Sequence, residues 1–131
     1  MLKQIRSVFK PDLFSNQVAI VTGGGTGIGA AIAQELAHLG CKVVIASRNK
    51  ERLEHSCEDM LKSHPSLEIF PLQCNIRKED DVKRLISGTL EKYGRLDFLV
   101  NNGGGQFRSR AEDVSAKVSC CHFYWCFYPC C

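Results

Sequence analysis

The sequence predicts an α/β fold built on a parallel β-sheet, because three features of the 131 residues agree. Short apolar runs alternate with segments whose apolar residues recur every three or four positions, as buried strands and amphipathic helices do. A glycine-rich segment follows the first apolar run, and a second follows the last. The resulting order, βαβαβαβ, implies right-handed crossovers and helices on both faces of the sheet.

The first strand and helix are predicted from residues 18–40. Residues 18–21 (VAIV) form a continuous apolar run, as does the second predicted strand at residues 42–46 (KVVIA). Such runs are typical of strands buried on both faces. Between them, Gly40 supplies a helix stop, and the inward stripe of the helix is predicted to be Ile32, Leu36 and Leu39.

The second helix and third strand carry their own boundary signals. Asn49 is placed to cap a helix that Pro65 ends. The inward face of this helix is predicted to be Leu53, Cys57, Met60 and Leu61. Residues 68–74 (EIFPLQC) form the third strand, and Pro71 inside it cannot donate to a neighbouring strand. We therefore expect this strand at a sheet edge.

The third helix has the clearest amphipathic pattern. Asp80 and Asp81 lie in its predicted first turn, and Gly94 lies just past its end. Its apolar residues are Val82, Leu85, Ile86, Leu90 and Tyr93. Residues 98–100 (FLV) form the fourth strand, before the glycine-rich residues 101–105. If nothing pairs beyond it, this strand is an exposed edge through which the chain can self-associate.

The glycine-rich segment at residues 22–29 (TGGGTGIG) lies between a strand and a helix, where a pyrophosphate can bind main-chain N–H groups and the positive helix end. Gly23 permits the tight turn, Gly27 lets the backbone approach the phosphates, and Gly29 lets the helix pack on the strand. Thr26 and Ile28, in the same loop, are further candidate cofactor contacts.

The end of the second strand bears on which dinucleotide is bound. Folds that prefer NAD place an acidic residue here for the ribose 2′-hydroxyl, whereas this chain has Ser47 and Arg48 and no acid before Glu51. A guanidinium offers a planar fork to phosphate oxygens, so the residues favour NADP(H). The alternative is that Arg48 is a solvated loop residue.

Further candidate residues follow the third and fourth strands. Asn75 can hydrogen-bond an adenine edge, and Ile76 can cover the face of the ring. Asn101 and Gly103 lie in the second glycine-rich segment, which leaves room for the adenosine ribose. The carboxyl ends of strands are where open α/β sheets bind ligands.

Together these residues resemble the short-chain dehydrogenase/reductase family. Residues 22–29 match its TGxxxGxG motif, and residues 101–104 match its NNxG motif with glycine at the usual alanine position. Asn75 stands where many members carry aspartate. The strings NNGGGQF (101–107), CNIR (74–77) and ASR (46–48) are most similar to the branch of peroxisomal trans-2-enoyl-CoA reductases, and the 2,4-dienoyl-CoA reductases are the nearest alternative.

The resemblance implies the N-terminal half of a Rossmann-type doubly wound sheet with strand order 3-2-1-4. It also implies NADPH-dependent reduction of a trans-2-enoyl-CoA substrate to the saturated acyl-CoA, in fatty-acid elongation. The family's catalytic tyrosine and lysine are spaced Tyr-x-x-x-Lys, and the 131 residues contain no such pair. We therefore assign no catalytic residue, and the alternative is a non-catalytic nucleotide-binding fragment.

The resemblance implies a peroxisomal location. The similar enzymes carry a peroxisomal address at the C-terminus, and this sequence ends in two cysteines instead. Without that address, the expected location is the cytoplasm.

Composition divides the chain into an arm (1–16), a partial NADP-binding domain (17–117) and a tail (118–131). The tail contains five of the eight cysteines and no charged residue. Three interpretations stay open: a segment translated from an intron or shifted frame, a metal site, or a membrane-surface anchor. Because adjacent cysteines are poor paired ligands, we predict no metal.

The charge balance and hydropathy exclude several other classes. Seventeen basic against 14 acidic residues give a net charge of +3, too weak for a specialised nucleic-acid binder. No apolar run reaches the ~20 residues that a transmembrane helix needs. Residues 1–10 are basic without an apolar stretch behind them, so we expect no secretory signal and an intracellular, soluble protein.

Overall fold

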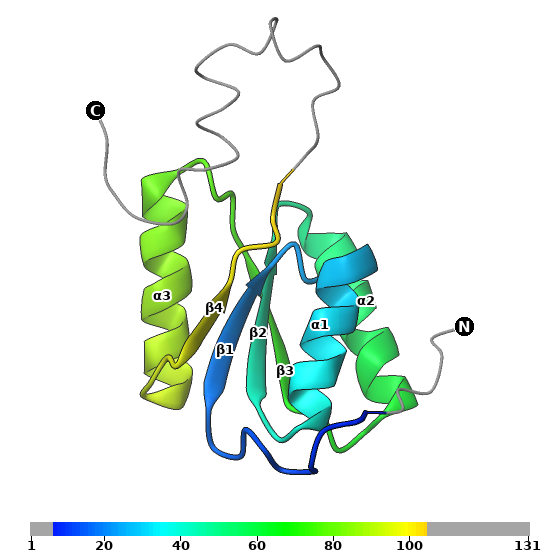
Figure 1. Ribbon diagram of the computed structural model, residues 1–131. Helices are drawn as coiled ribbons and strands as arrows, with labels where there is room; N and C mark the ends of the chain where they lie inside the picture. Colours follow the sequence, from blue (N-terminus) through cyan, green and yellow to red (C-terminus); the bar gives the residue numbers. More distant parts are fainter. Residues whose placement is uncertain (1–6, 105–131) are drawn as a thin grey trace, which may run out of the picture.

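The computed structural model of the chain describes residues 7–104. Within them, the strands β1 (Val18–Thr22), β2 (Lys42–Ser47), β3 (Ile69–Gln73) and β4 (Phe98–Val100) alternate with the helices α1 (Gly27–His38), α2 (Lys50–Ser63) and α3 (Glu79–Tyr93). The strands form one parallel sheet in the order β3-β2-β1-β4. Helices α1 and α2 cover one face and α3 covers the other (Figure 1). The predicted fold class and strand order are confirmed.

The two central strands divide their side chains between two cores. Ile20 and Val44 belong to the core under α3, while Val21 and Val43 belong to the larger core under α1 and α2. All four side chains are buried because successive residues of a strand point to opposite faces. This arrangement explains why both strands read as continuous apolar runs. Pro71 lies in β3, which is the edge strand that the proline predicted.

Helix α1 contacts the sheet through small residues. Its buried side chains include Ala30, Ala33 and Ala37, whereas Ile32 and Leu36 are only half-buried and pack at the margin of the core. The predicted stripe is therefore confirmed in part: Leu39 is buried, and Ile32 and Leu36 pack against the core without being enclosed by it. Alanine methyl groups let the helix lie close to the sheet, and the longer side chains are displaced to its flanks.

Helix α3 follows its predicted apolar pattern in part, since Val82, Leu85 and Tyr93 pack in the core beneath it. Leu85 and Thr89 are buried, and the Thr89 hydroxyl donates to the Leu85 carbonyl at 2.7 Å. Ile86 and Leu90, predicted to face inward, are 40% and 43% exposed. Within residues 7–104 a single helix covers this face of the sheet, so its line of contact is narrow and these two residues fall outside it. Gly94 ends the helix in the left-handed conformation with φ of 73°, as its position predicted.

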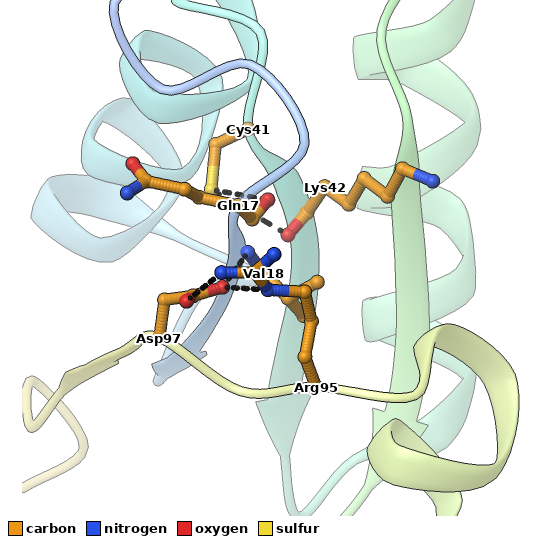
Figure 2. A network of polar contacts seen from close by, with 6 residues as sticks. All are labelled: Gln17, Val18, Cys41, Lys42, Arg95 and Asp97. Carbon is orange, nitrogen blue, oxygen red and sulfur yellow. Dashed lines mark hydrogen bonds and ion pairs between the residues drawn. The ribbon is translucent and has the colours of Figure 1, made fainter.

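A carboxylate joins β4 to β1 at the amino ends of the strands, opposite the glycine-rich loops (Figure 2). Asp97 accepts the Val18 N–H at 2.8 Å, and Arg95 donates to the same carboxylate through Nε at 2.9 Å and Nη2 at 2.6 Å. The Asp97 N–H in turn donates to the Val18 carbonyl at 2.9 Å. These contacts fix where β4 begins against β1.

We expect Asp97 to make the chain's stability depend on acid pH. The hydrogen bonds from Arg95 and from the Val18 N–H lower the pKa of Asp97 in the folded chain. The carboxylate therefore stabilises the fold above its unfolded pKa, and this contribution is lost as pH falls through the folded value. Thermal unfolding followed by circular dichroism between neutral and acid pH should show a smaller loss of stability in Asp97→Asn than in the parent chain. Equal losses would contradict the assignment.

Strand β4 is an edge among the described strands, since it pairs there with β1 alone. Leu99, at its centre, is 47% exposed. Self-association through this edge stays a prediction: sedimentation velocity should show an average mass that rises with protein concentration. Leu99→Lys should reduce the rise because a lysine on an edge strand opposes pairing. Leu90→Lys, at a similarly exposed leucine on helix α3, is the control, and equal effects of the two substitutions would oppose a contact through the strand edge.

Candidate functional site

A cleft of about 340 Å³ lies beyond the carboxyl ends of the strands. Open α/β sheets bind ligands at this position. The loops after β1, β2, β3 and β4 all contribute to the cleft. Its lining residues are Gly23, Gly25, Thr26, Ala46, Ser47, Arg48, Asn49, Arg52, Cys74, Asn75, Ile76, Arg77, Gly103 and Gly104.

The structure brings together most of the candidate residues that the sequence indicates. Those that line the cleft are Gly23, Thr26, Ser47, Arg48, Asn75, Ile76 and Gly103. Gly27, Ile28, Gly29 and Asn101 do not line it. Ile28 is 75% exposed and Gly29 is buried, so these neighbours lie on opposite sides of the first turn of α1.

The glycine-rich loop needs its glycines for different physical reasons. Gly27 has φ of +55°, and a Cβ added there would meet nothing within 4 Å, which leaves the space that an approaching phosphate would require. A Cβ on Gly29 would collide with the Gly23 carbonyl oxygen and with Nδ2 of Asn102. Gly29 thus permits packing against the loop and the Asn102 side chain, rather than against the strand as predicted.

Two side chains tie the first glycine-rich loop to the second. The buried Thr22 hydroxyl accepts the N–H groups of Asn102 at 3.0 Å and Gly103 at 2.8 Å. The Asn102 amide donates back to the Thr22 carbonyl at 3.2 Å and to the Gly23 carbonyl at 3.4 Å. Sequence reasoning selected Asn101 and missed both of these residues. The repeated asparagine was the available signal, but it does not say which of the two turns inward.

Ser47 is the last residue of β2, and Arg48 begins the loop to α2. The Ser47 hydroxyl donates to the Asn49 carbonyl at 3.4 Å. Arg48 is exposed, and its carbonyl accepts Gln73 Nε2 at 3.0 Å. The Asn49 side chain accepts the Arg52 N–H at 2.9 Å, which confirms it as the helix cap. Arg48 therefore lines the cleft from a main chain that a hydrogen bond holds in place.

Asn75 is held by a turn after β3. Its Oδ1 accepts the Arg77 N–H at 3.2 Å, and its own N–H donates to Asp81 Oδ2 at 3.0 Å. The N–H bond from Asn75, more than the nearby Arg84, lowers the pKa of Asp81. The bond from Arg77 fixes the orientation of the Asn75 side chain, which leaves its amide nitrogen and one lone pair of its oxygen for an adenine edge.

Arg52 and Arg77 also line the cleft, and sequence reasoning missed both. Arg52 lies in the first turn of α2, and Arg77 follows Ile76. The sequence feature that could have identified Arg52 is its position three residues after the Asn49 cap. This spacing places Arg52 in the first turn of the helix, next to the loop that lines the cleft. Cys74 contributes a thiol whose pKa is raised, chiefly by burial, so it stays protonated at neutral pH.

The structure limits what else the described residues can do. Residues 7–104 contain no group of three metal-ligating side chains and no helix long and apolar enough to cross a membrane. The Cys/His-rich tail and its three interpretations lie outside the described residues. No catalytic group is assigned within this part of the chain.

Comparison with known proteins identifies relatives of one kind. A family profile described as short chain dehydrogenase matches residues 17–120. The peroxisomal 2,4-dienoyl-CoA reductase [(3E)-enoyl-CoA-producing] of Danio rerio is 39% identical over 108 residues, which cover 82% of this chain and 36% of that protein. The chain thus spans little more than a third of the length of this curated relative.

Solved structures agree with the sequence comparison. The citronellol catabolism dehydrogenase of Pseudomonas aeruginosa PAO1 superposes with a TM-score of 0.73 and 39% identity, covering 86% of this chain and 45% of that one. The actinorhodin polyketide ketoreductase, solved with NADPH, has a TM-score of 0.69 and 28% identity, covering 78% of this chain and 38% of that one.

Proposed function

The chain belongs to the short-chain dehydrogenase family, and from this premise we propose that it forms the NADPH-binding part of a reductase of unsaturated acyl-CoA. The observation that carries the proposal is the cleft at the carboxyl ends of the strands, whose described lining residues include a glycine-rich loop and three arginines but no carboxylate. When bound, NADPH supplies a hydride; this chain's residues bind and orient the cofactor.

The residues present fit a phosphorylated dinucleotide. The open space at Gly27 and the start of α1 suit a pyrophosphate, because main-chain N–H groups and the helix dipole favour an anion there. A volume of about 340 Å³ is within the range of small-molecule sites. Ser47 and Arg48 would hold the ribose 2′-phosphate, and Asn75 and Ile76 would contact the adenine. Gly103 lines the cleft, and a Cβ there would crowd the Thr22 and Ile76 side chains.

The substrate class is proposed from resemblance. The relative from Danio rerio acts, by its name, on 2,4-dienoyl-CoA, and the same name appears for a relative from Arabidopsis thaliana. The strings ASR, CNIR and NNGGGQF favour a trans-2-enoyl-CoA substrate instead. Both are unsaturated acyl-CoA thioesters. The names of these relatives also support a peroxisomal location as part of the proposal.

Equilibrium binding followed by turnover tests the proposal. Titration of the full chain should give a lower Kd for NADPH than for NADH. Consumption of NADPH should then be measured with a trans-2-enoyl-CoA and, separately, with a 2,4-dienoyl-CoA. Turnover of one thioester identifies the substrate, whereas binding without turnover supports the non-catalytic nucleotide-binding alternative. Absence of NADPH binding would overturn the proposal.

A further inference from the structure

The cleft gathers positive charge without balancing carboxylates. Its described lining residues contain no aspartate or glutamate but three exposed arginines, Arg48, Arg52 and Arg77. The other described arginines are paired, Arg84 with Asp81 and Arg95 with Asp97, each at 2.6 Å. No described carboxylate forms an ion pair with an arginine at the cleft. The cleft thus holds three free guanidinium groups that an anionic ligand would neutralise.

Amide side chains fix the main chain from which each of these arginines extends. The Asn49 side chain accepts the Arg52 N–H at 2.9 Å, and the Asn75 side chain accepts the Arg77 N–H at 3.2 Å. Gln73 donates to the Arg48 carbonyl at 3.0 Å. A fixed starting point reduces the conformational entropy that a long side chain loses when it binds.

We propose that Arg52 supplies a second guanidinium to the 2′-phosphate of NADPH, and is therefore a specificity-determining residue that acts with Arg48. The inference rests on the proposed function and extends it to a residue on α2. Arg52 lies in the first turn of that helix, a few residues beyond Ser47, which ends β2, and Arg48, which follows it. Two planar forks can bond different oxygens of one phosphate dianion. The positive end of the α2 dipole adds to the attraction.

Neighbouring charges on the same turn distinguish Arg52 from a general basic surface. Lys50, two residues earlier, does not line the cleft, and its Nζ forms an ion pair with Glu54 at 3.7 Å. Glu51 does not line the cleft either. Of the three successive charged residues at the start of α2, only Arg52 reaches the cleft, and it carries the sign that a phosphate requires.

Binding of four nucleotides to the full chain tests the inference. Arg52→Gln keeps the helix-capping N–H but removes the charge, and Lys50→Gln is the matched control on the same turn. We expect Arg52→Gln to raise the Kd for NADPH about tenfold, the effect of losing one charge-assisted hydrogen bond. The Kd for NADH should not change. The pair 2′,5′-ADP and 5′-AMP should repeat this contrast without the nicotinamide. Lys50→Gln should leave all four affinities unchanged.

The outcomes separate this inference from the proposed function. If the parent chain prefers NADPH over NADH and Arg52→Gln keeps the full preference, the role of Arg52 is refuted while the proposed function stands. Equal weakening of NADPH and NADH by Arg52→Gln would assign Arg52 a structural role and also refute it. A parent chain without any preference for NADPH would overturn both.

Discussion

Gly29→Ala is expected to destabilise the chain and to weaken nucleotide binding at the same time. The added methyl group would collide with the Gly23 carbonyl oxygen and with the Asn102 amide, two groups that also join the glycine-rich loops. Neither is the free end of a flexible side chain, so the start of α1 must move. Overpacking of this kind costs about 3 kcal/mol. For a domain of this size, the loss corresponds to a thermal midpoint lower by roughly 10 °C or more.

Thermal unfolding by circular dichroism, together with NADPH titration, measures both effects. Gly88→Ala is the control, and it should change the stability in the opposite direction. Gly88 lies inside α3, and its added Cβ would lie 3.4 Å from Leu72 Cδ1, an ordinary contact. Replacing a helical glycine by alanine should stabilise the chain by about 0.5–1 kcal/mol. An unchanged midpoint and unchanged NADPH affinity in Gly29→Ala would show that the loop tolerates the side chain.

The fold could be predicted because the two central strands are buried on both faces. Ile20 and Val21 point to different cores, so the strand reads as a continuous apolar run whatever its neighbours are. Helix faces were less predictable because periodicity reports where apolar residues lie and not how close a helix approaches the sheet. Alanines such as Ala33 form the contact of α1, and Ile86 of α3 lies beyond the contact line.

The site could be predicted where local chain geometry sets it. Ser47 ends β2 and Arg48 directly follows it, so their place at the carboxyl edge follows from the strand itself. Arg52 could not be placed this way, because its reach depends on the angle at which α2 leaves the loop. Asn102 was missed because the last residue of β4, Val100, determines which asparagine turns back toward Thr22.

Thr22→Val should have the second large effect, because one hydroxyl organises the junction between the two glycine-rich loops. Thr22 is 1% exposed, and its Oγ1 accepts the Gly103 N–H at 2.8 Å. Valine has nearly the same shape but leaves that N–H without its acceptor. The Asn102 N–H is less affected, since it also donates to the Val100 carbonyl at 3.1 Å. An unsatisfied group of this kind costs about 2 kcal/mol.

Hydrogen exchange at the single amide of Gly103 distinguishes this mechanism from a general loss of packing. In Thr22→Val the Gly103 amide should exchange faster than in the parent chain, and NADPH should bind more weakly because Gly103 lines the cleft. Thr22→Ser keeps the hydroxyl and loses only a methyl group, so the Gly103 amide should stay protected despite a stability loss of about 1 kcal/mol. If serine, which keeps the hydroxyl, exposes the amide as much as valine does, the hydroxyl alone does not explain the protection of this amide and the proposed mechanism is refuted. If only valine does so, the hydroxyl holds the floor of the cleft in place.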